Sequence, residues 1–511
     1  MPGYGRLISS LLAVGLPAAL LVMLALPRAI GFPLSRDELA TATFASLSPG
    51  EQATAVTLVD AVATPYYLLV HAVTSVLPGD LGIRLPSLVA TAVAAVAVGV
   101  LAGRWWGVHS SAAAAALLAA NPLMVALAAT ARPAATATVC VALALLCADI
   151  AISARGQSAV VPWVGFVAAT VGAGVMHLFS LLAVIPVIAL ALRRGRRAAV
   201  SCLLAAVASA VVICPFAWWA SSQTGQVSWI PAVEAPVALA ILSNLVTSPD
   251  RLALDVLDAL GLVAIALGTG AALVIAARAR QIDPIVRLTF AFGVAVLPWL
   301  TLLAVSAVSP VLRTGYLAPS TIGVALIGAS LVRVEAPDGA AWVRHRIGAR
   351  FVGAVLLAGI LASTIPANVR AASAGFRHDD FPGLASELLA HAEPGDMVAV
   401  VQRRHETGLA AGVARYAGDE AFGSEVRQRL AAASALSAEV RQIVATAPLQ
   451  TTQTPARAWA PNNCSAWVVS AGELRDDDVH LLRRLGIVKA VDDGESRRFG
   501  GLRLTPARCD R

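Results

Sequence analysis

Residues 84–103 read RLPSLVATAVAAVAVGVLAG, an apolar run that follows a single arginine. An α-helix of about 20 predominantly apolar residues crosses the hydrocarbon core of a bilayer. The stretch therefore predicts a transmembrane helix that begins near Arg84. Hydrophobic residues make up 58% of the 511-residue chain and charged residues only 14%, whereas a soluble domain carries about a quarter charged residues.

Runs of similar length recur through the first 366 residues, between short loops that contain arginine. They predict a mainly α-helical, polytopic transmembrane bundle of about eleven helices. The expected spans are 9–27, 84–103, 111–128, 133–153, 160–176, 178–192, 199–219, 254–277, 288–308, 316–333 and 350–366. Two longer loops, 28–83 and 220–253, interrupt this series.

The composition changes after residue 366. Residues 367–511 contain equal numbers of acidic and basic residues, so the net charge of +7 belongs to the membrane part. Short strands are predicted at 397–401 and 466–470, and helices at 381–392, 424–446 and 476–485. We therefore expect two domains, a membrane module (1–366) and a soluble α/β domain (367–511).

The distribution of arginine predicts the orientation, because cytoplasmic loops are enriched in arginine and lysine. With the N-terminus inside, fourteen of the twenty basic residues of the membrane part are cytoplasmic. The six outside are Arg28, Arg36, Arg84, Arg132, Arg251 and Arg313. The sequence thus predicts a multi-pass plasma-membrane protein with a cytoplasmic N-terminus and an extracytoplasmic C-terminal domain.

The same charge pattern bears on partners. The positive charge follows the topology rule, and no basic-aromatic stripe is present, so membrane lipids are expected as partners and nucleic acid is not. No Walker loop, GxSxG elbow, HExxH motif or His/Cys/Asp cluster with zinc spacing occurs in the sequence. Cys464 and Cys509 lie in the domain expected outside, where a disulfide persists, and we predict that they pair.

Acidic residues gather in the first long loop, where Asp37 and Glu38 are adjacent, shortly after the first helix. Adjacent carboxylates beside a low-dielectric boundary are pushed apart in pKa, so that one of them serves as a base. The alternative interpretation is the first turn of a helix, where acidic residues are favourable. The residues alone leave both interpretations open.

Three of the outer arginines, Arg84, Arg132 and Arg313, stand at the expected outer starts of helices. A guanidinium group binds phosphate in a bidentate fashion, so a phosphate-bearing lipid is a natural partner. The alternative is snorkelling to headgroups or pairing with loop carboxylates. His71 and His177 are expected near the same surface.

The first loop resembles that of the C-type glycosyltransferase superfamily, in particular actinobacterial mannosyltransferases and relatives of the protein-O-mannosyltransferases. The matching segments are Asp37-Glu38, then residues 60–71 (DAVATPYYLLVH), then residues 84–87 (RLPS). Ala131-Arg132-Pro133 and residues 313–319 (RTGYLAP) are also similar. The sequence departs from the pattern at Ala63-Thr64, where relatives often have His-Gly, and at Thr130 and Ala134, where they have Glu and Tyr.

The resemblance implies an inverting hexosyltransferase that moves a sugar from a polyprenyl phosphate to a cell-envelope glycan or glycolipid. It implies catalytic roles for Asp37 and Glu38 and donor-phosphate binding by Arg84, Arg132 and Arg313. The implied substrate-binding residues are Asp60, Tyr66, Tyr67, His71, His177 and Tyr316. No cofactor is required with certainty, and a divalent cation stays an open question.

Mannose is the favoured sugar, and an arabinofuranosyltransferase is the alternative within the superfamily. A lipid-sugar flippase or transporter is the alternative from another class, and it needs ionisable groups or broken helices near the bilayer midplane. A third alternative is a scaffold whose outer domain binds a polymer.

The arginine bias predicts that a tag placed after Arg511 is accessible from outside intact cells, whereas a tag inserted near Gly195 is not. Labelling both variants with a membrane-impermeant reagent, before and after lysis, checks this. The opposite labelling pattern contradicts the topology.

Overall fold

The computed structural model describes residues 2–58, 60–154, 156–223, 230–246, 282–332, 364–369, 379–391, 397–402, 442–446, 465–471, 487–490 and 496–509, with isolated residues between these ranges. By its contacts the chain forms two compact units. The bundle unit comprises Met1–Ile30 and Arg84–Ser373, and the loop–sheet unit comprises Gly31–Ile83 and Ala374–Arg511. The expected division into a membrane module (1–366), with the catalytic residues in its first loop, and a soluble domain (367–511) stays a prediction.

The bundle unit is helical. Its helices are α1 (Pro2–Gly31), α5 (Asp80–Trp106), α6 (Val108–Ala120), α7 (Pro122–Ala128), α8 (Pro133–Ser153), α9 (Val160–Met176), α10 (Val187–Arg194), α11 (Arg196–Ser221), α12 (Ala235–Ser243), α14 (Ile282–Ser306) and α15 (Ser320–Ser330). The 3₁₀ segments η2 (Gly156–Ala159), η3 (Leu178–Ala183) and η5 (Thr314–Leu317) connect some of them. The first residues of α5 and the last residue of α1 belong to the loop–sheet unit.

The prediction of a mainly helical membrane protein is confirmed. Within the described residues five helices, α1, α5, α8, α11 and α14, are long and apolar enough to cross a membrane. A sixth span is present if α6 and α7, which bend by 64° at Asn121, count as one. Helix α9 is apolar but shorter, and α15 has 11 residues.

The expected span 111–128 bends at Asn121, and two further expected spans also differ from a straight helix. The stretch 178–192 folds as η3, a turn and most of α10, since Pro186 cannot donate the backbone hydrogen bond that a continuous helix needs. The stretch 316–333 begins as η5 before α15. The expected spans 254–277 and 350–366 lie almost entirely outside the described residues.

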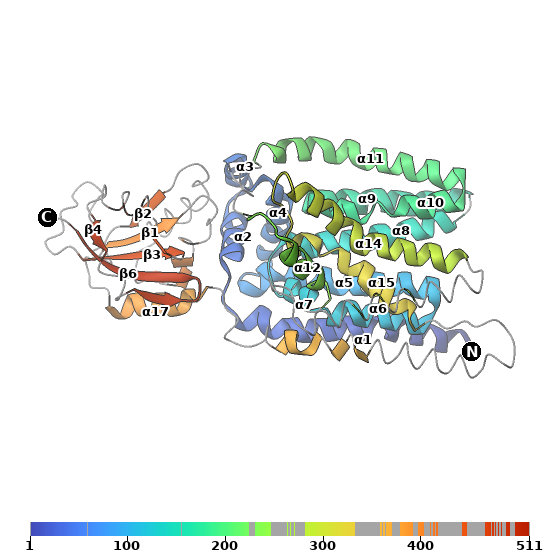
Figure 1. The fold of residues 1–511 in the computed structure, drawn as a ribbon, viewed down its shortest axis with the longest axis horizontal. Helices are drawn as coiled ribbons and strands as arrows, with labels where there is room; N and C mark the ends of the chain where they lie inside the picture. Colours follow the sequence, from blue (N-terminus) through green and yellow to red (C-terminus); the bar gives the residue numbers. More distant parts are fainter. Residues whose placement is uncertain are drawn as a thin grey trace. The chain divides into compact units, whose positions relative to one another are not determined.

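Burial distinguishes inner from outer helices. Figure 1 shows α1 and α11 at opposite edges of the bundle unit. Only 22% of the most apolar window of each is buried within the protein, against 67% for α5. Lipid-facing helices need no protein partner on their outer side, so α1 and α11 are suited to face the acyl chains.

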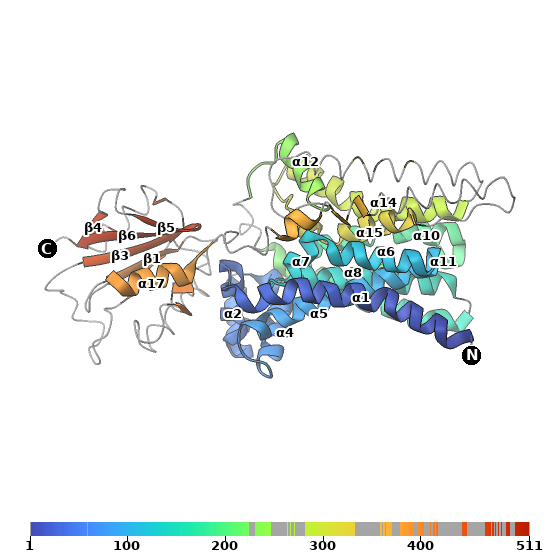
Figure 2. The same cartoon turned by 90° about the horizontal axis from the view of Figure 1, so that it is seen from below.

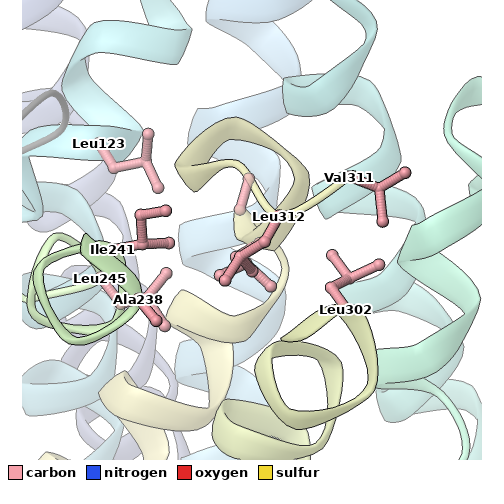
Figure 3. Packing of buried hydrophobic residues seen from close by; sticks show 9 residues of the cluster. Leu123, Ala238, Ile241, Leu245, Leu302, Val311 and Leu312 are labelled. Carbon is pink, nitrogen blue, oxygen red and sulfur yellow. The ribbon is translucent and has the colours of Figure 1, made fainter. Parts of the chain in front are cut away.

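A buried apolar cluster joins four segments in the bundle unit. The Leu312 cluster consists of Leu123, Ala238, Ile241, Leu245, Leu302, Val311, Leu312, Leu317 and Ala318, contributed by α7, α12, α14 and the segment around η5 (Figure 3). The backbone N–H groups of Val311 and Leu312 donate to the Ser306 hydroxyl at 3.0 and 2.9 Å. These two hydrogen bonds satisfy backbone donors just after the end of α14 and fix the segment that leads to η5.

Charged side chains near the C-terminal ends of α5 and α8 form a network. Asp149 accepts from Arg104 Nε and from Trp105 Nε1, both at 2.7 Å. Arg287, near the start of α14, donates to the Trp105 carbonyl oxygen at 2.7 Å, and its guanidinium lies over the Trp105 ring. Arg104 and Arg287 therefore share one end of the bundle unit, as the topology prediction requires; which face of the membrane this end occupies stays a prediction.

The loop–sheet unit contains α2 (Arg36–Ser46), α3 (Pro49–Leu58), η1 (Ala61–Ala63), α4 (Thr64–Thr74) and α17 (Phe381–His391). Its strands are β1 (Met397–Gln402), β2 (Gln442–Thr446), β3 (Ser465–Ala471), β4 (Ile487–Ala490), β5 (Arg497–Phe499) and β6 (Leu502–Cys509). The sheet order is β2-β1-β3-β6-β4, with β5 paired to β6. Only β1 and β3 run parallel among these pairs.

The α/β character of the C-terminal domain is thus as predicted, and α17 packs on the sheet beside β5 and β6 (Figure 2). The strands expected at 397–401 and 466–470 are β1 and β3. The prediction of a helix at 424–446 is wrong for residues 442–446, which form β2, and its remaining residues lie outside the described part of the chain. Val444 is β-branched and pairs with Val400 of β1, so cross-strand pairing outweighs a helical pattern there.

Candidate active site

The acidic pair of the first loop lies in the first turn of α2. Ser35 is the N-cap residue: its hydroxyl accepts from the Glu38 N–H at 3.4 Å, and the Glu38 carboxylate accepts from the Ser35 N–H at 3.0 Å. This capping box satisfies backbone donors that the start of a helix leaves without helical partners. Glu38 is buried, whereas Asp37 is exposed. The two neighbouring carboxylates therefore have different surroundings.

A second capping box stands one helix later. The Ser48 N–H and hydroxyl donate to the Glu51 carboxylate at 2.8 and 2.7 Å, at the start of α3. The Ser48 hydroxyl bond is the main cause that lowers the pKa of Glu51. Glu38 and Glu51 thus occupy equivalent positions, which gives Glu38 a structural task that Asp37 does not share.

The start of α4 is held against α2 by Asp60 and Tyr67. Asp60 adopts a left-handed backbone conformation with φ 57°, which aspartate tolerates better than most residues. Its carboxylate accepts from the Tyr67 hydroxyl at 2.9 Å, and the Tyr67 ring stacks on Phe44 with centroids 4.7 Å apart. Both residues were predicted to bind substrate, and here they bind one another.

His71 and Tyr66 complete this segment. His71 Nδ1 lies 2.8 Å from the Ala45 carbonyl oxygen, to which it must donate, so a neutral ring carries its lone pair on Nε2. Tyr66 is fully buried. The substrate-binding roles of these residues stay predictions.

Three polar contacts tie the first loop to the C-terminal segment within the loop–sheet unit. Arg36 Nε donates to Asp379 Oδ2 at 2.7 Å, and the Leu34 N–H donates to the Tyr416 hydroxyl at 2.7 Å. Asp80 forms an ion pair with Arg415. The first loop and the tail therefore fold as one body.

Arg84, Arg132 and Arg313, the arginines expected to bind phosphate, differ in burial within the bundle unit. Arg84 is buried and donates to the Ala29 carbonyl oxygen at 2.9 Å, close to the end of α1. Arg132 is half-buried at the N-cap of α8, and its carbonyl oxygen accepts from the Ser87 hydroxyl at 3.3 Å. Arg313 is exposed at the N-cap of η5. Arg84 and Arg132 lie at the same end of the bundle unit.

His177 and Tyr316 meet in an aromatic cluster at this end. Their ring centroids are 4.8 Å apart, and Phe179 lies 5.8 Å from His177 and 5.6 Å from Tyr316. Phe179 and Tyr316 also pack against the Leu312 cluster. The His177 Nδ1 atom is buried and has no hydrogen-bond partner among the described residues.

The electrostatics of His177 connect it to Arg132. His177 follows the last residue of α9 as its C-cap. Burial, and secondarily the positive charge of Arg132, lower its pKa to about 4. The imidazole is therefore neutral at physiological pH and adds no charge to the arginine beside it.

The structure thus brings together His177 and Tyr316, which are far apart in the sequence, and the charge of Arg132 acts on His177. Sequence reasoning missed Phe179, although an aromatic residue two positions after His177 could have indicated a ring contact with it. It also missed Asp379 as the partner of Arg36, for which the sequence offers no signal. Cys464 and the Cys509 side chain lie outside what the structure describes, so the disulfide stays a prediction.

No metal centre is evident in the described part of the chain: no group of three or more His, Cys, Asp or Glu side chains is placed to hold an ion. The loop–sheet unit contains the exposed Asp37 carboxylate, and the bundle unit contains arginines and the neutral His177.

Fold and site together define a helical membrane protein with charged and aromatic residues at one end of its bundle and a small mixed sheet after it. The same fold occurs in ArnT from Cupriavidus metallidurans. The apo structure of ArnT aligns with a TM-score of 0.55 and 13% identity over 99% of this chain and 98% of that one. ArnT bound to undecaprenyl phosphate aligns with a TM-score of 0.54 and 14% identity over 97% of both chains. No protein-family model matches the sequence, and a search of curated proteins found no match.

The lowered pKa of His177 predicts a pH dependence of stability. Between about pH 6.5 and pH 4 the unfolded chain binds a proton at this histidine that the folded protein does not, so the protein loses stability as the pH falls through this window. Melting temperatures in detergent between pH 7 and pH 4.5 test this. The His177→Gln variant should lose less than the wild type; an equally steep loss contradicts the prediction.

Proposed function

We propose that this protein is a membrane glycosyltransferase that transfers a sugar from a polyprenyl-phosphate donor to a cell-envelope glycan or glycolipid. The observation that carries the proposal is the likeness of fold over nearly the whole of both chains to ArnT, which has been solved with undecaprenyl phosphate. The motifs of the first loop and the arginines of the bundle unit supply the required chemistry. We place the reaction at the outer face of the plasma membrane, on the arginine bias.

Arg132 is the first candidate for the donor phosphate. It stands at the N-cap of α8, a helix of 21 residues, and Pro133 occupies the first helical position. The start of a helix carries partial positive charge, which favours an anion there and acts in the same direction as the guanidinium. Arg313, exposed at η5, is the second candidate. Arg84 is the third, and its buried side chain also holds the end of α1.

Asp37 is proposed as the general base. In a single displacement the acceptor hydroxyl attacks the anomeric carbon, and its proton passes to the Asp37 carboxylate. The bond between the anomeric carbon and the phosphate oxygen breaks, and its electron pair leaves with the polyprenyl phosphate. Arginine stabilises the charge that develops on the phosphate. Glu38 acts beside Asp37 by capping α2, because its carboxylate is engaged with Ser35.

The finer assignments rest on the sequence. We favour mannose, with arabinofuranose as the alternative, since the first-loop motifs resemble mannosyltransferases. Tyr316, His177, Asp60, Tyr66, Tyr67 and His71 remain the proposed substrate-binding residues.

The broken helix at Asn121 bears on the transporter alternative. Asn121 Oδ1 accepts from the Met124 N–H at 3.2 Å, and its Nδ2 donates to the Leu245 carbonyl oxygen at 2.7 Å. The break is thus satisfied within the protein, and His109 is the sole ionisable side chain in residues 108–128. A broken helix is a feature of transporters, but the polar atoms of Asn121 at this break are paired within the protein, so we interpret it as a structural bend.

The proposal predicts that Asp37→Asn lowers turnover by about 10²- to 10⁴-fold, the usual contribution of a general base, while donor affinity changes little. The exposed position of Asp37 predicts that this variant folds normally. Purified enzyme, assayed with polyprenyl-phosphate mannose and an envelope acceptor, gives turnover and donor affinity separately.

Glu51→Gln is the matched control, because it removes a carboxylate from the same loop and should leave turnover near the wild-type value. Arg132→Ala and Arg313→Ala should weaken donor binding instead. If Asp37→Asn keeps normal turnover and Asp60→Asn has none, the role of base passes to Asp60. Normal turnover in both refutes the first-loop mechanism.

A further inference from the structure

Arg36, the residue before Asp37, is held by a carboxylate from the other end of the chain. Its Nε lies 2.7 Å from Asp379 Oδ2, and the two residues are 343 positions apart. The side chain of Asp379 is 5% exposed and that of Arg36 is 31% exposed. The pair therefore joins a buried anion to a partly exposed cation.

The burial of Asp379 makes this pair costly to break. Exposed ion pairs contribute little, but removing one partner of a buried charge leaves the other uncompensated. Asp379 Oδ1 is also buried, without a hydrogen-bond partner among the described residues. Among the described residues, Arg36 is consequently the cation that compensates this carboxylate.

The backbone around Asp379 is fixed by the sheet. Asp379 forms an isolated bridge with Gly500, between β5 and β6, and the Asp380 N–H donates to the Phe499 carbonyl oxygen at 3.2 Å. Asp380 Oδ1 accepts from the Gly383 N–H at 3.1 Å, at the start of α17. Asp379 therefore presents its carboxylate from a rigid position.

A second contact holds the other side of the capping box. The Leu34 N–H donates to the Tyr416 hydroxyl, and the Tyr416 ring stacks on Phe381, which is fully buried at the start of α17. Residues on both sides of Ser35 are thus anchored to the region of α17. Asp37 follows Arg36 directly in the first turn of α2, so its position depends on these anchors.

We propose that Asp379 is a positioning residue for the glycosyl transfer: through Arg36 it fixes the first turn of α2, and with it the Asp37 carboxylate, relative to the acceptor hydroxyl. This inference rests on the proposed function and assigns the C-terminal domain a part in turnover. Asp379 does not touch substrate; it sets the geometry of the base.

The test uses full-length purified protein and the polyprenyl-phosphate mannose assay. Asp379→Asn should lower kcat about tenfold to a hundredfold, as small misplacements of reacting groups do, with the donor KM within twofold of wild type. Asp379→Glu keeps the charge but lengthens the side chain, so its kcat should lie between those of the wild type and Asp379→Asn. It also serves if Asp379→Asn does not fold.

Asp80→Asn is the matched control, because it breaks the ion pair with Arg415 in the same unit without touching α2. It should turn over at the wild-type rate. Equal losses of kcat in Asp80→Asn and Asp379→Asn overturn the positioning role, because they indicate a general loss of structure.

A double-variant cycle separates this inference from the proposed function. If Asp379 acts through Asp37, the double variant Asp37→Asn/Asp379→Asn is no slower than Asp37→Asn alone. Additive losses, or a slow Asp37→Asn with a normal Asp379→Asn, overturn the positioning role alone. A normal Asp37→Asn overturns the base assignment, and the positioning role with it.

Discussion

Exclusion of charge from the hydrocarbon core of a bilayer is the constraint on which the bundle unit depends. Its apolar helices place their ionisable groups at their ends. At one end Arg84 closes on the last turn of α1 and Arg132 lies beside a neutral His177. At the other end Asp149 joins Arg104 to the Trp105 indole.

The first loop combines buried apolar side chains, such as Leu39, Phe44 and Val70, with specific polar contacts. A pair of capping boxes starts α2 and α3, and the tail holds the first of them through Arg36 and Leu34. Because Glu38 is committed to its cap, the adjacent acidic residues divide their tasks: one maintains the helix and the other stays exposed. This division leaves Asp37 exposed on a helix turn that the cap and the tail hold in place.

The sequence predicted best where one physical property dominates. Runs of about 20 apolar residues gave α1, α5, α8, α11 and α14, because length and hydropathy decide a span. Shorter or proline-containing runs, such as 178–192, were less certain because tertiary contacts decide them. The helix-turn interpretation of the acidic pair followed from the preference for acidic residues in a first turn, and the structure adds the capping box of Ser35 and Glu38. The Arg36–Asp379 pair could not be predicted, since nothing in either local sequence points to the other. His177 and Tyr316 shared only an expected outer position, and their ring contact comes from the packing of helix ends.

The central claim is that this fold transfers a sugar from a polyprenyl phosphate. The most direct measurement follows both products at once, in proteoliposomes that contain the purified protein, polyprenyl-phosphate mannose or arabinofuranose labelled in the sugar, and envelope lipid acceptors. The account predicts that one of the two donors yields labelled glycolipid, with one polyprenyl phosphate released for each sugar transferred. Labelled donor that crosses the bilayer intact, with no polyprenyl phosphate released from either donor, would contradict it and favour a transporter.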